Sequence, residues 1–277
     1  MPQAITDGLK INYEDLGEGK PALLFLPAWC SNNCYSTLPQ KCAANRRVLV
    51  VDWRGYGKSE TPADDFGSKE LLSDALAVIE ASGEKEIIVV SYAHSGWVAI
   101  ELRRKLGERI KKIVHLEWLM LPPPKLMLDM LRALSESEKY EATLDQLYTI
   151  WLDGDNNSEL KSFLYDEMKN YDAEQWMRTG REIAASYDRW GSPLDALQSL
   201  EPPVSVRHLF CHIKDPEYQT AQESFASTYP WFSARRLPEP AHTHFPMFEI
   251  PDEIAAAIDE FIVAEELAIQ QQGQIPA

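Results

Sequence analysis

The stretch IIVVSYAHSG, residues 87–96, decides how the chain folds. Its apolar, β-branched half predicts a buried strand, and the small and polar residues after it predict a sharp turn into a helix. In a strand–turn–helix motif of this form, the central side chain is held above the sheet as a nucleophile. Ala93 occupies that position, and its methyl group cannot attack a carbonyl. The site has therefore either lost its chemistry or performs a reaction that needs no enzyme nucleophile.

Short apolar runs alternate with helical patterns through most of the chain, which predicts a mostly parallel sheet flanked by helices. This alternation stops at a run of three prolines, residues 122–124, and the sequence is then helical and aromatic until about residue 200. We therefore predict an α/β core made of residues 1–120 and 201–277, and a helical cap made of residues 121–200. Such a cap would lie over the carboxyl ends of the strands, where open α/β sheets bind ligands. The predicted strands are residues 11–15, 23–26, 48–53, 87–91, 113–116, 205–210 and 234–237.

The composition limits the partners that we expect. With a formal net charge of -16, the chain is not expected to bind nucleic acid or an anionic membrane. It has no apolar run near the ~18 residues of a membrane span and no signal-peptide pattern at its start, so we expect a cytoplasmic protein. Its four cysteines form no C-x-x-C pair, and neither a zinc-ligand cluster nor a dinucleotide fingerprint is present. We therefore expect no metal and no other cofactor, while the oligomeric state stays open.

Two loops that follow predicted strands resemble those of α/β-hydrolases. Residues 52–59, DWRGYGKS, match the D-x-R-G-x-G-x-S turn that is common in that fold. Residues 26–30, LPAWC, lie where the fold supplies one backbone N–H of an oxyanion hole, here that of Trp29; the second is that of His94, directly after the nucleophile position. Two such amides at a helix N-terminus bind negative charge whatever the neighbouring side chain is. Ala93 thus removes the attacking group but leaves the anion pocket.

A histidine late in the chain is the candidate base. Residues 241–246, AHTHFP, lie between the last predicted strand and the final predicted helix, where α/β-hydrolases keep their catalytic histidine. We favour His244 over His242, because the H-F-P context is similar to that motif. Its second ring nitrogen needs an acceptor, which fixes the tautomer and favours the imidazolium. Glu117, at the end of the strand before the cap, and Asp215, after the next strand, both fit, and the residues alone do not separate them.

His94 and the aromatic residues of the cap each have two interpretations. His94 stands at a helix start, where the dipole disfavours its protonated form, so a neutral His94 either donates to a substrate oxygen or is structural. The aromatic side chains either form the core of the cap or stack on a flat aromatic ligand that they shield from water. These residues are Trp118, Tyr148, Trp151, Tyr165, Tyr171, Trp176, Tyr187 and Trp190.

Taken together, these features make the chain similar to one family, the cofactor-independent 3-hydroxy-4-oxoquinoline and 3-hydroxy-4-oxoquinaldine 2,4-dioxygenases. The resemblance runs through core and cap and is most specific in the WLDG, PEY and PWFS segments. It is carried by LPAWC (26–30), WRGYG (53–57), HSGWV (94–98), WLM (118–120), WLDG (151–154), PEY (216–218), PWFS (230–233) and THFP (243–246).

The resemblance implies an α/β-hydrolase fold and a reaction that uses neither metal nor flavin. It makes His244 the general base that removes the 3-hydroxyl proton of the substrate. It also selects Glu117 rather than Asp215 as the carboxylate that orients His244, and it makes Trp29 and Trp151 pocket residues. The substrate anion would react with O2 directly, and a cyclic peroxide would break down to an N-acylanthranilate and carbon monoxide.

Three residues depart from the pattern of that family, which has serine at the position of Ala93, aspartate at that of Glu117 and histidine at that of Ser31. We expect Ser31, Ala93 and His94 to contact the substrate. Losing one hydrogen bond would cost a dioxygenase ~1–3 kcal/mol, whereas losing the nucleophile would cost a hydrolase several. The departures therefore favour oxygenation and affect the substrate or the rate more than the reaction type.

Two other functions stay open on the sequence alone. One is a hydrolase in which His244 activates water, and the other is a non-catalytic protein that binds a ligand in the hydrolase pocket. Within the leading hypothesis, the sequence does not specify whether the quinolone carries an alkyl chain at its 2-position.

Overall fold

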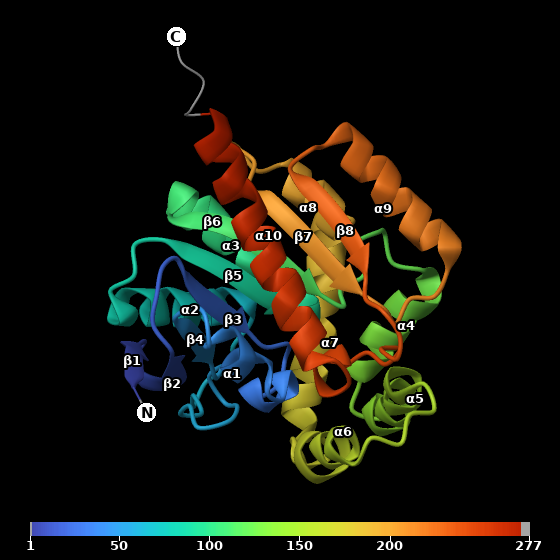
Figure 1. The fold of residues 1–277 in the computed structure, drawn as a ribbon. Helices are drawn as coiled ribbons and strands as arrows, with labels where there is room; N and C mark the ends of the chain where they lie inside the picture. The colour runs from blue at the N-terminus through green and yellow to red at the C-terminus, as the bar shows by residue number, and fades with distance from the viewer. Residues whose placement is uncertain (1, 273–277) are drawn as a thin grey trace.

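The computed structural model describes residues 2–272 of the 277-residue chain, and an eight-stranded sheet forms its centre (Figure 1). The spatial order of the strands is β1-β2-β4-β3-β5-β6-β7-β8. The β1–β2 and β2–β4 pairs are antiparallel, and every other neighbouring pair is parallel. The predicted mostly parallel sheet is therefore confirmed. The strands are β1 (Gln3–Thr6), β2 (Leu9–Leu16), β3 (Ala22–Leu26), β4 (Val48–Val51), β5 (Ile87–Tyr92), β6 (Ile110–Leu116), β7 (Ser205–Phe210) and β8 (Phe232–Arg236).

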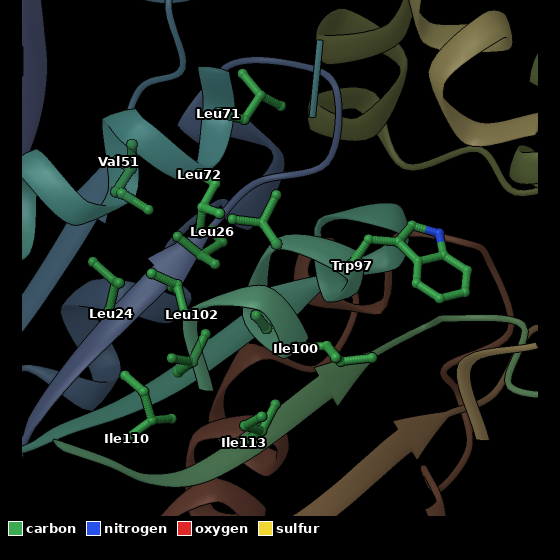
Figure 2. Close-up of a cluster of buried hydrophobic side chains, with 14 of the residues drawn as sticks. Leu24, Leu26, Val51, Leu71, Leu72, Trp97, Ile100, Leu102, Ile110 and Ile113 are labelled. Carbon is green, nitrogen blue, oxygen red and sulfur yellow. The ribbon is translucent and has the colours of Figure 1, made fainter. Parts of the chain in front are cut away.

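The central strands are covered by helices on both faces of the sheet, which explains why β3 and β4 are continuously apolar. Successive side chains of a strand point to opposite faces. On one face, Leu24 and Leu26 of β3 pack with α2 (Ser68–Ser82) and α3 (Gly96–Leu106), as Figure 2 shows. On the other face, Leu23 and Phe25 belong to a cluster with α1 (Leu38–Cys42) and α10 (Pro251–Gln272).

Two strand predictions need correction. The edge strand β1 was not predicted, because only Ala4 of its four residues is buried and the segment carries little apolar signal. The strand predicted at residues 48–53 ends at Val51, because Asp52 begins a turn. The Asp52 carboxylate accepts from Asn12 Nδ2 at 2.9 Å and from the backbone N–H of Lys58 at 3.1 Å, which holds the turn in place.

Helices fill the chain between β6 and β7. In Figure 1, α4 and α5 lie towards the ends of β7 and β8 to which the arrows point, and α6 lies farther from them. Helix α8 packs on α3 instead, and the Arg104 guanidinium of α3 donates to the Ala196 carbonyl of α8 at 3.1 Å. No helix in the described range is long and apolar enough to span a membrane. These helices are α4 (Lys125–Leu134), α5 (Tyr140–Leu152), α6 (Ser158–Ser162), α7 (Ala173–Trp190) and α8 (Pro193–Gln198); α9 (Pro216–Thr228) follows β7.

Candidate active site

The turn after β5 keeps the backbone of a nucleophile elbow although it carries no nucleophile. Ala93 has φ 47°, a conformation in which an L-residue with a Cβ is strained. The hydroxyl of Ser95 holds the turn, since it accepts from the backbone N–H of Tyr92 at 3.0 Å and lies 2.7 Å from the Leu26 carbonyl oxygen. A Cβ on Gly96 would lie 2.2 Å from the ring of Trp118, so only glycine fits there. The strained geometry that presents a residue above the sheet is therefore retained.

A cavity of about 370 Å³ opens above this turn, between the core loops and the cap. Its lining includes six of the seven predicted site residues: Trp29, Ala93, His94, Glu117, Trp151 and His244. Apolar side chains of α4 and α5 form most of the remaining wall, and they include Leu126, Met127, Met130, Leu131, Leu147 and Ile150. The cavity thus combines polar groups at the elbow with apolar side chains of the cap.

His244 lines the cavity from the loop between β8 and α10. Its backbone N–H donates to the Trp151 carbonyl at 2.9 Å, and its own carbonyl accepts from the Tyr92 hydroxyl at 2.9 Å. Burial lowers the pKa of His244 well below its ordinary value, and the neighbouring His212 and His94 lower it further. The free site therefore holds a neutral imidazole, the form that can accept a proton.

The ring of Trp151 stacks on that of His244, with centroids 5.8 Å apart and planes 18° from parallel. The face of an indole ring attracts a cation. This contact therefore stabilises the imidazolium that forms when His244 takes a proton. It then offsets part of the cost of burying that charge.

Glu117 lies in the cavity but does not orient His244 in this structure. It follows β6 with φ 46°, and its carboxylate accepts from the backbone N–H groups of Cys211 and His212 at the end of β7. Burial raises its pKa to about 8. No hydrogen bond between Glu117 and His244 is recorded in the described chain. The contacts of the Glu117 carboxylate in this structure are thus to backbone amides, which leave it acceptor capacity, and its role in orienting His244 stays a prediction.

Asp215, the alternative carboxylate, is exposed and lies outside the cavity lining. It caps α9, where it accepts from the backbone N–H of Glu217 at 2.9 Å. This is the ordinary role of an aspartate at a helix start. The resemblance-based choice of Glu117 over Asp215 therefore agrees with the position of the two side chains.

The two predicted oxyanion amides flank the elbow. Within residues 2–272, the backbone N–H groups of Trp29 and His94 donate to no carbonyl group through a loop, a turn or a contact between elements. Trp29 is held by Phe66, whose ring stacks on it at 6.3 Å and 17°. Burial lowers the pKa of His94 to about 3, and its Nδ1 is buried without a hydrogen-bond partner. A neutral His94 ring and the predicted amides of Trp29 and His94 thus belong to residues that line the cavity with Ala93.

Ser31 differs from the expectation that it contacts the substrate. It is buried but does not line the cavity. Its hydroxyl donates to Glu167 and accepts from the backbone N–H of Asn33 at 3.2 Å, while its own N–H donates to the Tyr171 hydroxyl at 3.0 Å. These polar neighbours turn Ser31 towards the cap residues beside the cavity, so we drop it from the site.

His212 is a cavity residue that the sequence analysis missed. Asp215 is the carboxylate of this loop, but His212 stands closer to the end of β7, where the triad acid of many hydrolases is found. Its ring centroid lies 5.6 Å from that of His244. Position directly after a predicted strand was the signal that could have identified it.

The cap segment 150–157 is fastened to the core loops that carry the histidines. Alternating contacts run along this segment, so that Trp151 is fixed over His244. The contacts pair Ile150 O with His212 Nε2, Trp151 O with His244 N, Asp153 with Lys214, Asp155 with His242, and Asn157 Nδ2 with Phe248 O.

Comparisons with known proteins agree with this geometry. Residues 23–257 match the alpha/beta hydrolase family. The 2-heptyl-3-hydroxy-4-quinolone dioxygenase AqdC2 of Rhodococcus erythropolis is 34% identical over 261 residues, which cover 92% of this chain and 96% of the relative. The 1H-3-hydroxy-4-oxoquinoline 2,4-dioxygenase of Pseudomonas putida is 33% identical over 267 residues, 95% of this chain and 100% of the relative. The chain belongs to the 3-hydroxy-4-quinolone dioxygenases of the α/β-hydrolase family.

Solved structures of such dioxygenases share the fold of this one closely. An AqdC variant in complex with its substrate, from work on ring cleavage of the Pseudomonas quinolone signal, superimposes with a TM-score of 0.90 at 28% identity. The superposition covers 95% of this chain and 99% of the AqdC variant chain. The 1H-3-hydroxy-4-oxoquinoline 2,4-dioxygenase structure gives 0.88 at 32% identity, with 95% and 100% covered. The family resemblance noted in the sequence is confirmed.

Proposed function

We propose that this dioxygenase cleaves the ring of a 2-alkyl-3-hydroxy-4(1H)-quinolone without a cofactor, giving an N-acylanthranilate and carbon monoxide. The observation that carries the proposal is the turn after β5. It has the strained backbone of a nucleophile elbow, but alanine stands at the nucleophile position, and no hydrogen bond from the N–H groups of Trp29 and His94 to a carbonyl outside the regular elements is found in residues 2–272. A site of this kind can hold an anion and accept a proton, but it cannot form an acyl-enzyme.

The chemistry follows from the residues around the elbow. Neutral His244 accepts the 3-hydroxyl proton of the substrate, so that the O–H bond breaks and an N–H bond forms. The amides of Trp29 and His94 hold the resulting oxyanion, because they aim N–H dipoles at the point where charge develops. The electron-rich ring then reacts with O2, and both oxygen atoms enter the products. Trp151 stabilises the imidazolium while the anion exists.

Independence of metals is supported by the donor set of the site. Among the described residues, the group with metal-ligand spacing is Asp155, His242 and Glu249, and none of these three lines the cavity. Of the histidines that do line it, His212 contacts the Ile150 carbonyl, and the rings of His94 and His244 pack on aromatic neighbours. All four cysteines are buried free thiols, which supports the expected cytoplasmic location because a reducing compartment keeps thiols unpaired.

The apolar wall supports an alkyl chain at the 2-position. Met127, Met130 and Leu147 line the cavity, and Leu126 and Ile150 are 72% and 46% exposed. Exposed apolar side chains beside a cavity form a mouth through which a chain can reach solvent. The Rhodococcus relative acts, by its name, on a 2-heptyl quinolone, which agrees with this wall.

The test is to mix the protein with 2-heptyl-3-hydroxy-4-quinolone without oxygen and then admit air. We expect the absorbance spectrum of the bound anion first, and then O2 uptake matched by carbon monoxide release. Turnover that proceeds without O2 would instead support a hydrolase in which His244 activates water. Tight binding without turnover, unchanged by His244→Ala, would support a non-catalytic binding protein.

A further inference from the structure

The segment PEY, residues 216–218, lies at the start of α9 and takes no part in the proposed reaction. Its Tyr218 hydroxyl donates to the Trp118 carbonyl at 2.8 Å and accepts from the Met120 backbone N–H at 3.0 Å. All three residues are buried, so water does not compete for these bonds. One hydroxyl group therefore fixes the main chain of residues 118–120, which leads from β6 into the cap.

His208 in β7 holds the same stretch of main chain. Its Nε2 lies 3.3 Å from the backbone nitrogen of Trp118, and a backbone N–H only donates, so Nε2 is the acceptor. In a neutral ring Nδ1 then carries the proton and donates to Gln222 Oε1 of α9 at 2.6 Å. Burial lowers the pKa of His208 to about 4, in agreement with a neutral ring. Helix α9 therefore reaches Trp118 twice, directly through Tyr218 and indirectly through His208.

These contacts lie directly after the strained residue Glu117. Its φ of 46° is a conformation that a residue with a Cβ keeps only where the surrounding structure holds it. Its own N–H donates to the Leu209 carbonyl at 2.9 Å, and the next N–H along the chain, that of Trp118, donates to His208. Its carboxylate accepts from backbone N–H groups that follow β7. The place of this carboxylate in the cavity therefore depends on contacts with β7 and α9.

We propose that Tyr218 and His208 are positioning residues for Glu117: they hold the main chain of residues 118–120 and so keep the Glu117 carboxylate in the cavity. The inference rests on the proposed function and on the predicted role of Glu117 as the carboxylate that orients His244. Neither Tyr218 nor His208 lines the cavity, so neither touches the substrate. A change in either one acts on the reaction through the groups that it holds, which alters kcat more than KM.

The experiment is a double-mutant cycle of Tyr218→Phe and Glu117→Gln, which measures whether the two side chains act through each other. Phenylalanine keeps the ring of Tyr218 and removes its hydroxyl, whereas glutamine keeps the shape of Glu117 and removes its charge. Tyr229→Phe is the matched control, because it removes a hydroxyl at the far end of α9 that contacts Gln198. The readout is kcat and KM for O2-dependent cleavage of 2-heptyl-3-hydroxy-4-quinolone.

For Tyr218→Phe we expect kcat to fall about 10- to 100-fold, as for a displacement of ~1 Å at a reacting site, while KM changes by less than about threefold. Glu117→Gln should lower kcat at least as far. In the Glu117→Gln protein, Tyr218→Phe should then change kcat by less than about twofold, because the charge that it would displace is gone. Tyr229→Phe should match the unaltered protein. If Tyr218→Phe does not fold, Gln222→Leu replaces it, since it removes the acceptor of His208 Nδ1 and should show the same dependence on Glu117.

Three results would overturn the assignment. One is a double variant in which the two losses of kcat multiply, because the role of Tyr218 would then be structural and independent of Glu117. Another is a kcat of Tyr218→Phe close to that of the unaltered protein. The third is an unchanged kcat of Glu117→Gln, since a carboxylate without a role needs no positioning. Failure of the proposed function is distinguishable, because the unaltered protein would then form no anion or take up no O2.

Discussion

Affinity should rise with the length of the 2-alkyl chain, because the cavity wall formed by α4 and α5 is apolar. Burying one methylene group is worth ~0.8 kcal/mol, which corresponds to a roughly fourfold change in Kd. The entropy lost when the alkyl chain becomes ordered offsets part of this free energy, so we expect about two- to fourfold tighter binding per methylene. The gain should level off for carbons that reach the exposed side chains of Leu126 and Ile150.

The assay is an anaerobic titration of 3-hydroxy-4-quinolones that carry chains from methyl to nonyl. Leu126→Glu places a carboxylate at the mouth of the cavity, and this exposed position tolerates a charge. It should weaken binding of the heptyl compound by about three- to tenfold and leave the methyl compound within twofold. Ile5→Glu, at an exposed apolar position on β1, is the control and should change neither. Equal Kd values for the methyl and heptyl compounds would refute the alkyl interpretation of the wall.

Three further predictions follow from the elbow and the cavity. Ala93→Ser adds a hydroxyl that can donate one hydrogen bond to the substrate, so kcat/KM for the quinolone should change by less than about tenfold; a larger change in steady-state assays would contradict this. Burial raises the pKa of Glu117 to about 8, so the stability that its neutral form contributes is lost as the pH rises through that value. The melting temperature of Glu117→Gln relative to the unaltered protein should therefore rise between about pH 5 and about pH 9, and a constant difference would contradict the raised pKa. Gly96→Ala forces a Cβ to within 2.2 Å of the Trp118 ring, which should cost at least about 2 kcal/mol of unfolding free energy in urea denaturation, whereas an unchanged midpoint would refute the clash.

The core could be predicted from the sequence because its signals are local. β3 is apolar throughout and β5 begins with four apolar residues, and the glycines of residues 52–59 mark a turn by themselves. Position along the chain was also enough to place His244 and Trp29, since each lies just beyond a strand whose carboxyl end must reach the same edge of the sheet.

The details of the site depend on contacts between distant segments, which no local pattern contains. No sequence pattern predicts that the Glu117 carboxylate accepts hydrogen bonds from backbone N–H groups at the end of β7. Nor could it tell that Ser31 would face Glu167 and Tyr171. His212 was missed because its contact with the Ile150 carbonyl joins it to a helix of the cap that is distant in the sequence.

The central claim is that one imidazole draws the proton from the substrate. The most direct test is carbon monoxide release by His244→Ala, measured beside the unaltered protein on 2-heptyl-3-hydroxy-4-quinolone. Loss of a positioned base predicts a fall in kcat of roughly 10²- to 10⁴-fold, while anaerobic binding of the quinolone stays within about tenfold. Carbon monoxide release within threefold of the unaltered rate would contradict the account.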